Sequence, residues 1–220
     1  MGRRPARGRS RNAKDRNAKS YARREPVREE YDYVLIVCEG QKTEPFYLQD
    51  LRSFYRLSNA NIEITPASGS DPMSIVRFAE DRAGEGYDRM FCVFDRNGHA
   101  NYDQALRRVR DSALGQAGKL TAITSWPCFE FWLLLHYGYR SAAFEAAGGR
   151  SPCENAIRAL LAHFPGYAKG HKTVFADLHD KMEAAIGHAR RLANDNAQTG
   201  STNPATLMHE LVEYLRGLKP

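Results

Sequence analysis

The sequence of 220 residues contains no apolar run near the roughly 20 residues that span a bilayer. Its basic N-terminus lacks the apolar stretch of a secretory signal. The four cysteines form no CxxC pair, which argues against a zinc ribbon. We therefore expect a cytoplasmic protein whose cysteines are reduced and pack as small apolar side chains. They are Cys38, Cys92, Cys128 and Cys153.

Positive charge is concentrated at one end of the chain. Residues 1–30 hold 11 Lys and Arg against 4 Asp and Glu, a net charge of +7. The whole chain carries +6, which leaves −1 for residues 31–220. With few large apolar side chains, residues 1–30 should be disordered when alone, and their cations can contact phosphates. The alternative is a solvated tail that only aids solubility.

Short apolar runs alternate with helical periodicity in the first half of the chain. The expected strands cover residues 33–38, 61–65, 89–94 and 120–124, and the expected helices cover residues 43–57, 71–83 and 102–113. Short runs rich in β-branched residues are typical of strands buried on both faces of a parallel sheet. This alternation predicts the α/β class, with a mostly parallel four-stranded sheet flanked by helices.

The second half of the chain is helical in pattern. The expected helices cover residues 129–137, 152–163, 173–193 and 205–217. We therefore divide the chain into a basic arm, an α/β core and a helical extension packed on the core. Their predicted ranges are 1–30, 31–125 and 126–220.

Two of the predicted buried strands end in an acidic residue, Glu39 in one case and Asp95 in the other. Ligands of open α/β sheets bind at the carboxyl ends of the strands, and hard divalent cations prefer oxygen ligands. If the two strands are neighbours, both carboxylates converge on one crevice and can hold a metal ion.

Residues 95, 97 and 99 share one face while the chain stays extended. Asn97 can then offer an oxygen to the same metal as Asp95, and His99 can contact phosphate or donate a proton. The alternative is that Asp95 and Asn97 only form an Asx turn after the strand.

Glu130 lies between Phe129 and Phe131 in an intensely apolar segment. A carboxylate in such surroundings should be paired, neutral or bound to a metal. We predict a further acid or ligand of the site, and the alternative is a salt bridge in the core. His136 does not share a helix face with Glu130, and we assign it a structural role.

Several cations are candidates for contacts with nucleic acid. Lysine acts on phosphate as a point charge, and the helix N-terminus near Lys42 adds main-chain amides. For the loop that contains Lys169, the alternative is ordinary solvation. The residues predicted to bind nucleic acid are Lys42, Arg96, Lys169 and Lys172.

Three segments together resemble the signature blocks of RloB-like proteins, which are similar to Toprim domains and occur in restriction and abortive-infection loci. The segments are Val37–Pro45 (VCEGQKTEP), Val93–His99 (VFDRNGH) and Ser125–His136 (SWPCFEFWLLLH). Asn203–Thr206 and the region of Tyr167 and Lys169 also fit. The resemblance covers roughly residues 31–215 and leaves out the basic arm.

The resemblance implies a Toprim-like fold in which Glu39 is a general acid/base or metal ligand and Asp95 is a metal ligand. It also implies Mg²⁺ or Mn²⁺, a DNA or RNA substrate, a role in antiphage defence and an AAA-type ATPase partner.

Two positions depart from the family pattern. Asn97 stands where the family has a third acid. Asparagine keeps an oxygen ligand but lacks the negative charge, so a second metal ion would lack charge compensation and a two-metal mechanism is disfavoured. Trp126 stands where members usually have Asn, and it can stack on a base or simply pack.

These features together predict a Mg²⁺-dependent nuclease that hydrolyses phosphodiesters in antiphage defence or restriction. The alternative is a non-catalytic module that binds nucleic acid or a partner ATPase. A nucleotide-processing phosphotransferase is a third possibility, but the chain lacks the GxxxxGK[ST] loop of ATP hydrolysis. The sequence leaves open whether the substrate is DNA or RNA.

Overall fold

The computed structural model describes residues 1–2, 32–58, 61–96 and 98–218. The expected disorder of the basic arm concerns residues 1–30, nearly all of which lie outside the described residues. Asn97 lies outside them too. Tyr31–Pro220 form one compact unit, and the predicted boundary between residues 125 and 126 falls inside a strand.

A mixed sheet forms the centre of this unit. Its strands are β1 (Val34–Cys38), β2 (Ile62–Pro66), β3 (Arg89–Asp95), β4 (Leu120–Trp126) and β5 (Ala205–Thr206). The spatial order is β2-β1-β3-β4-β5. The pairs β1–β2, β1–β3 and β3–β4 are parallel, as predicted. The α/β class with a mostly parallel sheet is therefore confirmed.

The prediction of four strands is wrong by one, because β5 adds an antiparallel edge to β4. It is only two residues long, too short to carry a strand pattern. Its position is fixed by tertiary contacts. The Ser125 and Thr206 hydroxyls lie 3.0 Å apart, and the Leu207 N–H donates to the Thr124 carbonyl at 2.9 Å.

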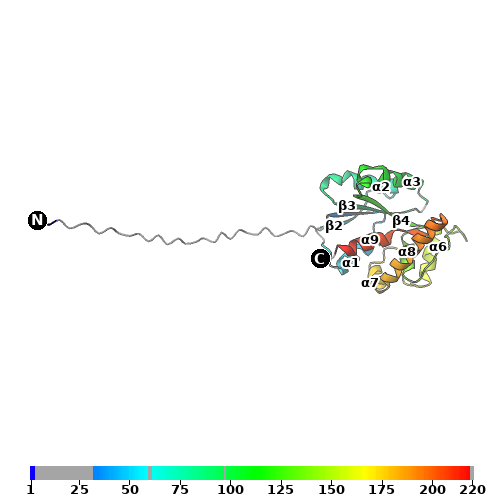
Figure 1. The fold of residues 1–220 in the computed structure, drawn as a ribbon. Helices are drawn as coiled ribbons and strands as arrows, with labels where there is room; N and C mark the ends of the chain where they lie inside the picture. Colours follow the sequence, from blue (N-terminus) through cyan, green and yellow to red (C-terminus); the bar gives the residue numbers. More distant parts are fainter. Residues whose placement is uncertain (3–31, 59–60, 97, 219–220) are drawn as a thin grey trace. The chain divides into compact units, whose positions relative to one another are not determined.

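Helices cover both faces of the sheet (Figure 1). The α-helices are α1 (Thr43–Phe54), α2 (Pro72–Asp81), α3 (Tyr102–Asp111), α4 (Ala113–Gln116), α5 (Glu130–Leu135), α6 (Pro152–Leu161), α7 (Val174–Leu178), α8 (Met182–Thr199) and α9 (Met208–Gly217). The 3-10 helices are η1 (Ala83–Glu85) and η2 (His179–Lys181).

Several predicted helices differ from those observed. The helix expected over residues 102–113 ends at Asp111, where extended Ser112 separates α3 from α4. The helix expected over residues 173–193 is interrupted by η2 and then continues as α8 to Thr199. The helix expected from residue 205 begins at Met208 instead, because Ala205 and Thr206 pair with β4.

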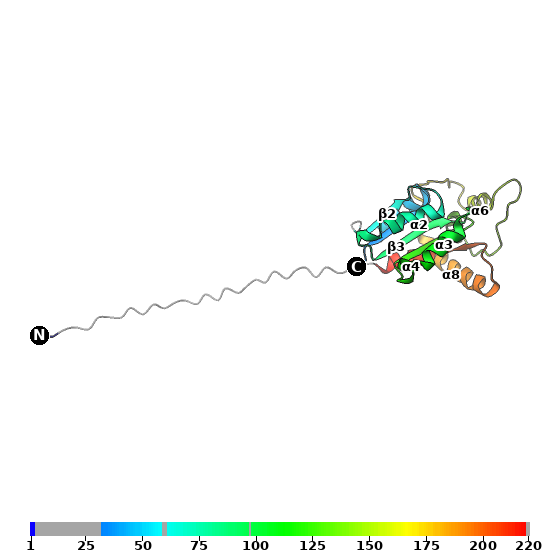
Figure 2. The same ribbon diagram turned by 90° about the horizontal axis from the view of Figure 1, so that it is seen from above.

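The central strand β1 is buried on both sides, and its alternate residues face two separate cores. Val34, Ile36 and Cys38 face a large core with α1 and α5–α9. Leu35 and Val37 face a smaller core with α2 and α3. Figure 2, which views the molecule from above, shows α2, α3 and α4 over the strands. The helical extension therefore packs on the same face as α1.

The expectation of four reduced cysteines is wrong for two of them. Cys128 and Cys153 are joined by a disulfide that links the residues just before α5 to the first turn of α6. Cys38 and Cys92 are free and buried, as predicted for small apolar side chains. Contacts between α5 and α6 bring together two cysteines separated by 25 positions, which no spacing rule reveals. Among the described residues, no helix is long and apolar enough to cross a membrane.

Candidate active site

Glu39 and Asp95 lie side by side at the carboxyl ends of β1 and β3. Cys38 is in register with Val93, and the Glu39 N–H donates to the Val93 carbonyl at 2.9 Å. The Asp95 N–H in turn donates to Oε2 of Glu39 at 2.8 Å. The convergence of the two strand ends that the sequence predicts is therefore present.

His99 completes the surroundings of Glu39. Its Nε2 lies 2.9 Å from Oε1 of Glu39, so both carboxylate oxygens have a hydrogen-bonding partner. The side chains of His99 and Glu39 are 26% and 17% exposed. A ligand can therefore reach this pair from solvent, and any cation bound by Glu39 has to share its oxygens with these partners.

Glu44 is a further carboxyl group of the site that the sequence analysis missed as a functional residue. It lies in the first turn of α1, and its side chain covers Gly40 directly. A Cβ atom added to Gly40 would lie 2.8 Å from Cδ of Glu44, closer than real contacts allow. Glycine at position 40 thus lets the Glu44 carboxyl approach the end of β1.

The carboxyl groups influence one another strongly. Burial, followed by the charges of Glu44, Glu39 and Glu130, raises the pKa of Asp95 well above its ordinary value. A hydrogen bond from the Phe129 main chain opposes this shift. Four carboxyl groups therefore share one small region, and each ionised group makes ionisation of the next more costly.

Glu44 titrates near neutrality for similar reasons. Burial, with smaller effects from the charges of Glu130 and Glu39, raises its pKa from 4.5 to about 7. A main-chain hydrogen bond and the charge of Lys169 act in the opposite direction. Near neutral pH this carboxyl can therefore exchange a proton, as a general acid or base requires.

Glu130 lies at the start of α5 and is only 2% exposed. The Tyr167 hydroxyl donates to its Oε1 at 2.9 Å, and Lys169 Nζ lies 3.6 Å from the same oxygen. Burial and the charge of Glu130 raise the pKa of the Tyr167 hydroxyl. Glu130 thus belongs to an ion pair and also borders the acidic cluster. The alternative of a salt bridge in the core is met only on the Glu130 side, because the Lys169 side chain is 61% exposed.

The predicted nucleic-acid-binding residues divide into two places. Lys169 lies against the acidic cluster, and Lys42 packs beside the same loop because the Gly170 N–H donates to Thr43 Oγ1 at 2.9 Å. Lys172 is exposed farther along this loop. Arg96 instead lies over the Trp126 ring, with its guanidinium carbon 3.7 Å from the ring centroid.

A family model described as RloB-like protein matches residues 34–215. The chain belongs to this family. The match covers the whole acidic cluster and the loop of Lys169, so the resemblance seen in the three sequence blocks is confirmed. No curated protein and no solved structure matches this RloB-like chain.

The carboxylate oxygens at this site are of the kind that a hard cation prefers. Among the described residues, however, Glu39, Glu44 and Asp95 do not form a group of three whose ligand atoms all lie within 4.8 Å of one another. The three-residue group whose possible ligand atoms lie within 4.8 Å of one another, within the described part of the chain, is Cys128, Glu130 and Cys153. Both of its sulfurs are in the disulfide. The carboxylates of Glu39 and Asp95 supply oxygen donors. A cation would offset the neighbouring negative charges that, after burial, raise the pKa of Asp95.

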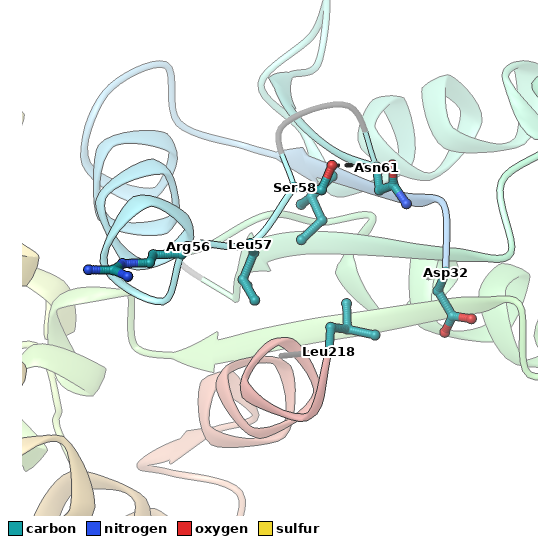
Figure 3. A pocket seen from close by; sticks show the side chains of 7 residues that line it. Asp32, Arg56, Leu57, Ser58, Asn61 and Leu218 are labelled. Carbon is teal, nitrogen blue, oxygen red and sulfur yellow. Dashed lines mark hydrogen bonds between the residues drawn. The ribbon is translucent and has the colours of Figure 1, made fainter. Parts of the chain in front are cut away.

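A small hollow of about 130 Å³ lies elsewhere on the RloB-like unit (Figure 3). Asp32 and Asn61, which line it, precede β1 and β2, so it lies at the amino ends of the strands. Ser58 Oγ donates to Asn61 Oδ1 at 3.3 Å across its rim. The acidic cluster lies at the opposite ends of these strands, so this hollow is not part of the candidate site.

Proposed function

We propose that this RloB-like protein hydrolyses phosphodiester bonds of nucleic acid with the help of Mg²⁺ or Mn²⁺. The observation that carries the proposal is the gathering of Glu39, Glu44, Asp95 and Glu130 beside Lys169. Buried carboxylates this close to one another repel and destabilise the fold, and a bound cation would compensate their charges. The likeness of the family to Toprim domains supports the same chemistry.

Glu39 and Asp95 are the residues that would hold the cation. Asn97, the third ligand predicted from the sequence, lies outside the described residues. A bound divalent cation supplies Lewis-acid stabilisation of the charge that develops on the phosphate oxygens. Lys169 and Lys42 would hold the neighbouring phosphates as point charges.

The proton transfers would fall to the chain's own residues. Hydrolysis requires that a water oxygen forms a bond to phosphorus while the bond to the leaving oxygen breaks. Glu44, with a pKa of about 7, can accept the proton of the water. His99, held by Glu39 at 2.9 Å, can donate a proton to the leaving oxygen. Glu130 would hold Lys169 in place and shape the local charge.

The proposal includes a role in antiphage defence or restriction, an AAA-type ATPase partner and a cytoplasmic location. The first two rest on the family resemblance alone. A cytoplasmic location agrees with the free Cys38 and Cys92, whereas the Cys128–Cys153 disulfide opposes it, since disulfides are rare in the cytosol.

The test is cleavage of DNA and RNA by the purified full chain with Mg²⁺, with Mn²⁺ and with EDTA. We expect metal-dependent cleavage that falls roughly 100-fold or more in Glu39→Gln and in Asp95→Asn. Matched changes at exposed acids, Glu210→Gln on α9 and Asp81→Asn on α2, should retain full activity.

Binding without metal-dependent cleavage would show that the chain is the non-catalytic module instead. The same conclusion would follow if cleavage survived both Glu39→Gln and Asp95→Asn.

A further inference from the structure

A groove of about 440 Å³ lies beside the end of β3, between α3, the β4–β5 edge and α8. Its volume is within the roughly 300–1,000 Å³ of small-ligand sites. Its lining contains both apolar and polar side chains. The lining that matters here is Arg96, Trp126, Leu106, Leu207 and Asp103.

Arg96 and Trp126 form a stacked pair in this groove. The guanidinium carbon lies 3.7 Å from the centroid of the Trp126 ring and 5.3 Å from that of Tyr102. The Arg96 N–H donates to the Ser125 carbonyl at 3.0 Å. This main-chain bond fixes the pair at the tips of β3 and β4, one residue beyond Asp95.

We propose that this groove receives an unpaired nucleobase of the same strand whose phosphate lies at the acidic cluster. The inference rests on the proposed function, since it names the form of the nucleic acid that the site accepts. A base offers a flat π-face to the Arg96–Trp126 pair, and stacking on aromatic and guanidinium planes is how proteins hold single strands.

The other lining residues fit the same occupant. Leu106 and Leu207, which are both partly exposed, can cover the apolar faces of a base. The carboxylate of Asp103 can accept a hydrogen bond from an exocyclic amino group. The cationic Arg96 is attractive to the phosphates on either side of the base. A base inside a duplex is stacked and paired, so it cannot enter this groove without being extruded.

The test measures binding by the full chain in EDTA, so that no cleavage interferes. The probes are fluorescently labelled single-stranded DNA and RNA oligonucleotides and the duplexes of the same sequences, followed by anisotropy. We expect Trp126→Ala to weaken single-strand binding about tenfold and to leave duplex binding within twofold. Phe54→Ala is the matched control, because Phe54 is an aromatic residue 53% exposed on α1.

Tryptophan fluorescence provides a second readout that does not depend on the stability of Trp126→Ala. The chain has two tryptophans, and Trp132 is fully buried and donates to the Tyr47 hydroxyl. Single strands should quench the emission of the unmodified chain, and Trp126→Phe should abolish this change. Arg96→Gln should weaken the quenching, whereas Arg107→Gln, an exposed position on α3, should not.

Equal weakening of single-strand and duplex binding by Trp126→Ala would overturn the inference, and so would quenching that survives Trp126→Phe. The proposed function fails separately, through cleavage that is absent or insensitive to Glu39→Gln. Binding and quenching that persist in Glu39→Gln while cleavage is lost would support both.

Discussion

Glu44 differs from an ordinary surface acid in its pKa, which burial raises. It lies in the first turn of α1, where a carboxylate is usually favourable. Its pKa is nevertheless about 7, because burial and the charges of Glu130 and Glu39 outweigh that benefit. The site therefore holds a carboxyl whose proton is easily exchanged, at a cost to the stability of the fold.

The raised pKa of Glu44 makes the free energy of unfolding depend on pH. The pKa of Glu44 is raised from 4.5 to about 7 in the folded chain, so the folded state binds this proton more tightly than the unfolded state. Well below pH 4.5, Glu44 is protonated in both the folded and the unfolded state, so it does not change the free energy of unfolding there. The free energy of unfolding falls as the pH rises from 4.5 to 7, by up to about 3 kcal/mol for this group.

We therefore expect Glu44→Gln to raise the free energy of unfolding at pH 8 by up to about 3 kcal/mol and to change it little at pH 4. Urea unfolding in EDTA at the two pH values measures this difference. Glu210→Gln, at an exposed acid, should show no pH-dependent gain. An equal effect of Glu44→Gln at both pH values would contradict the assignment.

Gly40→Ala tests whether the close approach of Glu44 matters. The added Cβ would displace the Glu44 carboxyl, which is the end of a flexible side chain, so the fold should survive. We expect cleavage to fall about tenfold or more, with a melting temperature close to that of the unmodified chain. Gly84→Ala, where a Cβ would meet open space, is the matched control. Unchanged cleavage in Gly40→Ala would show that the position of Glu44 is unimportant.

At the scale of elements, the disulfide ties the two helices that border the acidic cluster. Cys128 precedes Glu130 by two residues, and Cys153 lies in the first turn of α6 beside the Glu130 carboxyl. The closed loop spans 25 positions. The covalent link therefore restrains the segment that positions Glu130, while β3 and β1 hold Asp95 and Glu39 independently.

Closing a loop of this length should stabilise the fold by about 3 kcal/mol. We expect that reductant lowers the urea midpoint of the unmodified chain but leaves that of the Cys128→Ala/Cys153→Ala variant unchanged. Thiol titration of the denatured, unreduced chain should find the free Cys38 and Cys92 only. Four titratable thiols under those conditions would show that the bond does not form in solution.

At the scale of the whole molecule, the net positive charge lies in the N-terminal arm and the acidic cluster lies in the nearly neutral folded unit. Residues 1–30 carry a net +7 and residues 31–220 carry −1, so the unit that contains the acidic cluster has little overall attraction for a polyanion. The cations of the arm would supply the binding that does not depend on sequence, and the cluster would act on the phosphate that is held near it.

Salt dependence of binding tests this division. If about five cations of the arm meet phosphates, the slope of log affinity against log salt should be roughly −4 to −5 on duplex DNA. Replacing the first five arginines of the arm by Gln in the full chain should make the slope shallower by a similar amount. The residues are Arg3, Arg4, Arg7, Arg9 and Arg11. Substituting five exposed arginines outside the arm and away from the groove of Arg96 should leave the slope nearly unchanged. An unaltered slope in the arm variant would exclude the role of the arm.

The sequence by itself determined the α/β class and the strand ends that carry Glu39 and Asp95. Both follow from local patterns: short buried runs such as β1 and β3, alternating with helical periodicity, leave few topologies open. The carboxyl ends of parallel strands then share one edge. The tertiary structure alone decided the fifth strand, the Cys128–Cys153 disulfide and the entry of Glu44 into the cluster. These depend on contacts between residues distant in sequence or on the direction of a single side chain, and neither leaves a periodic signal in the chain.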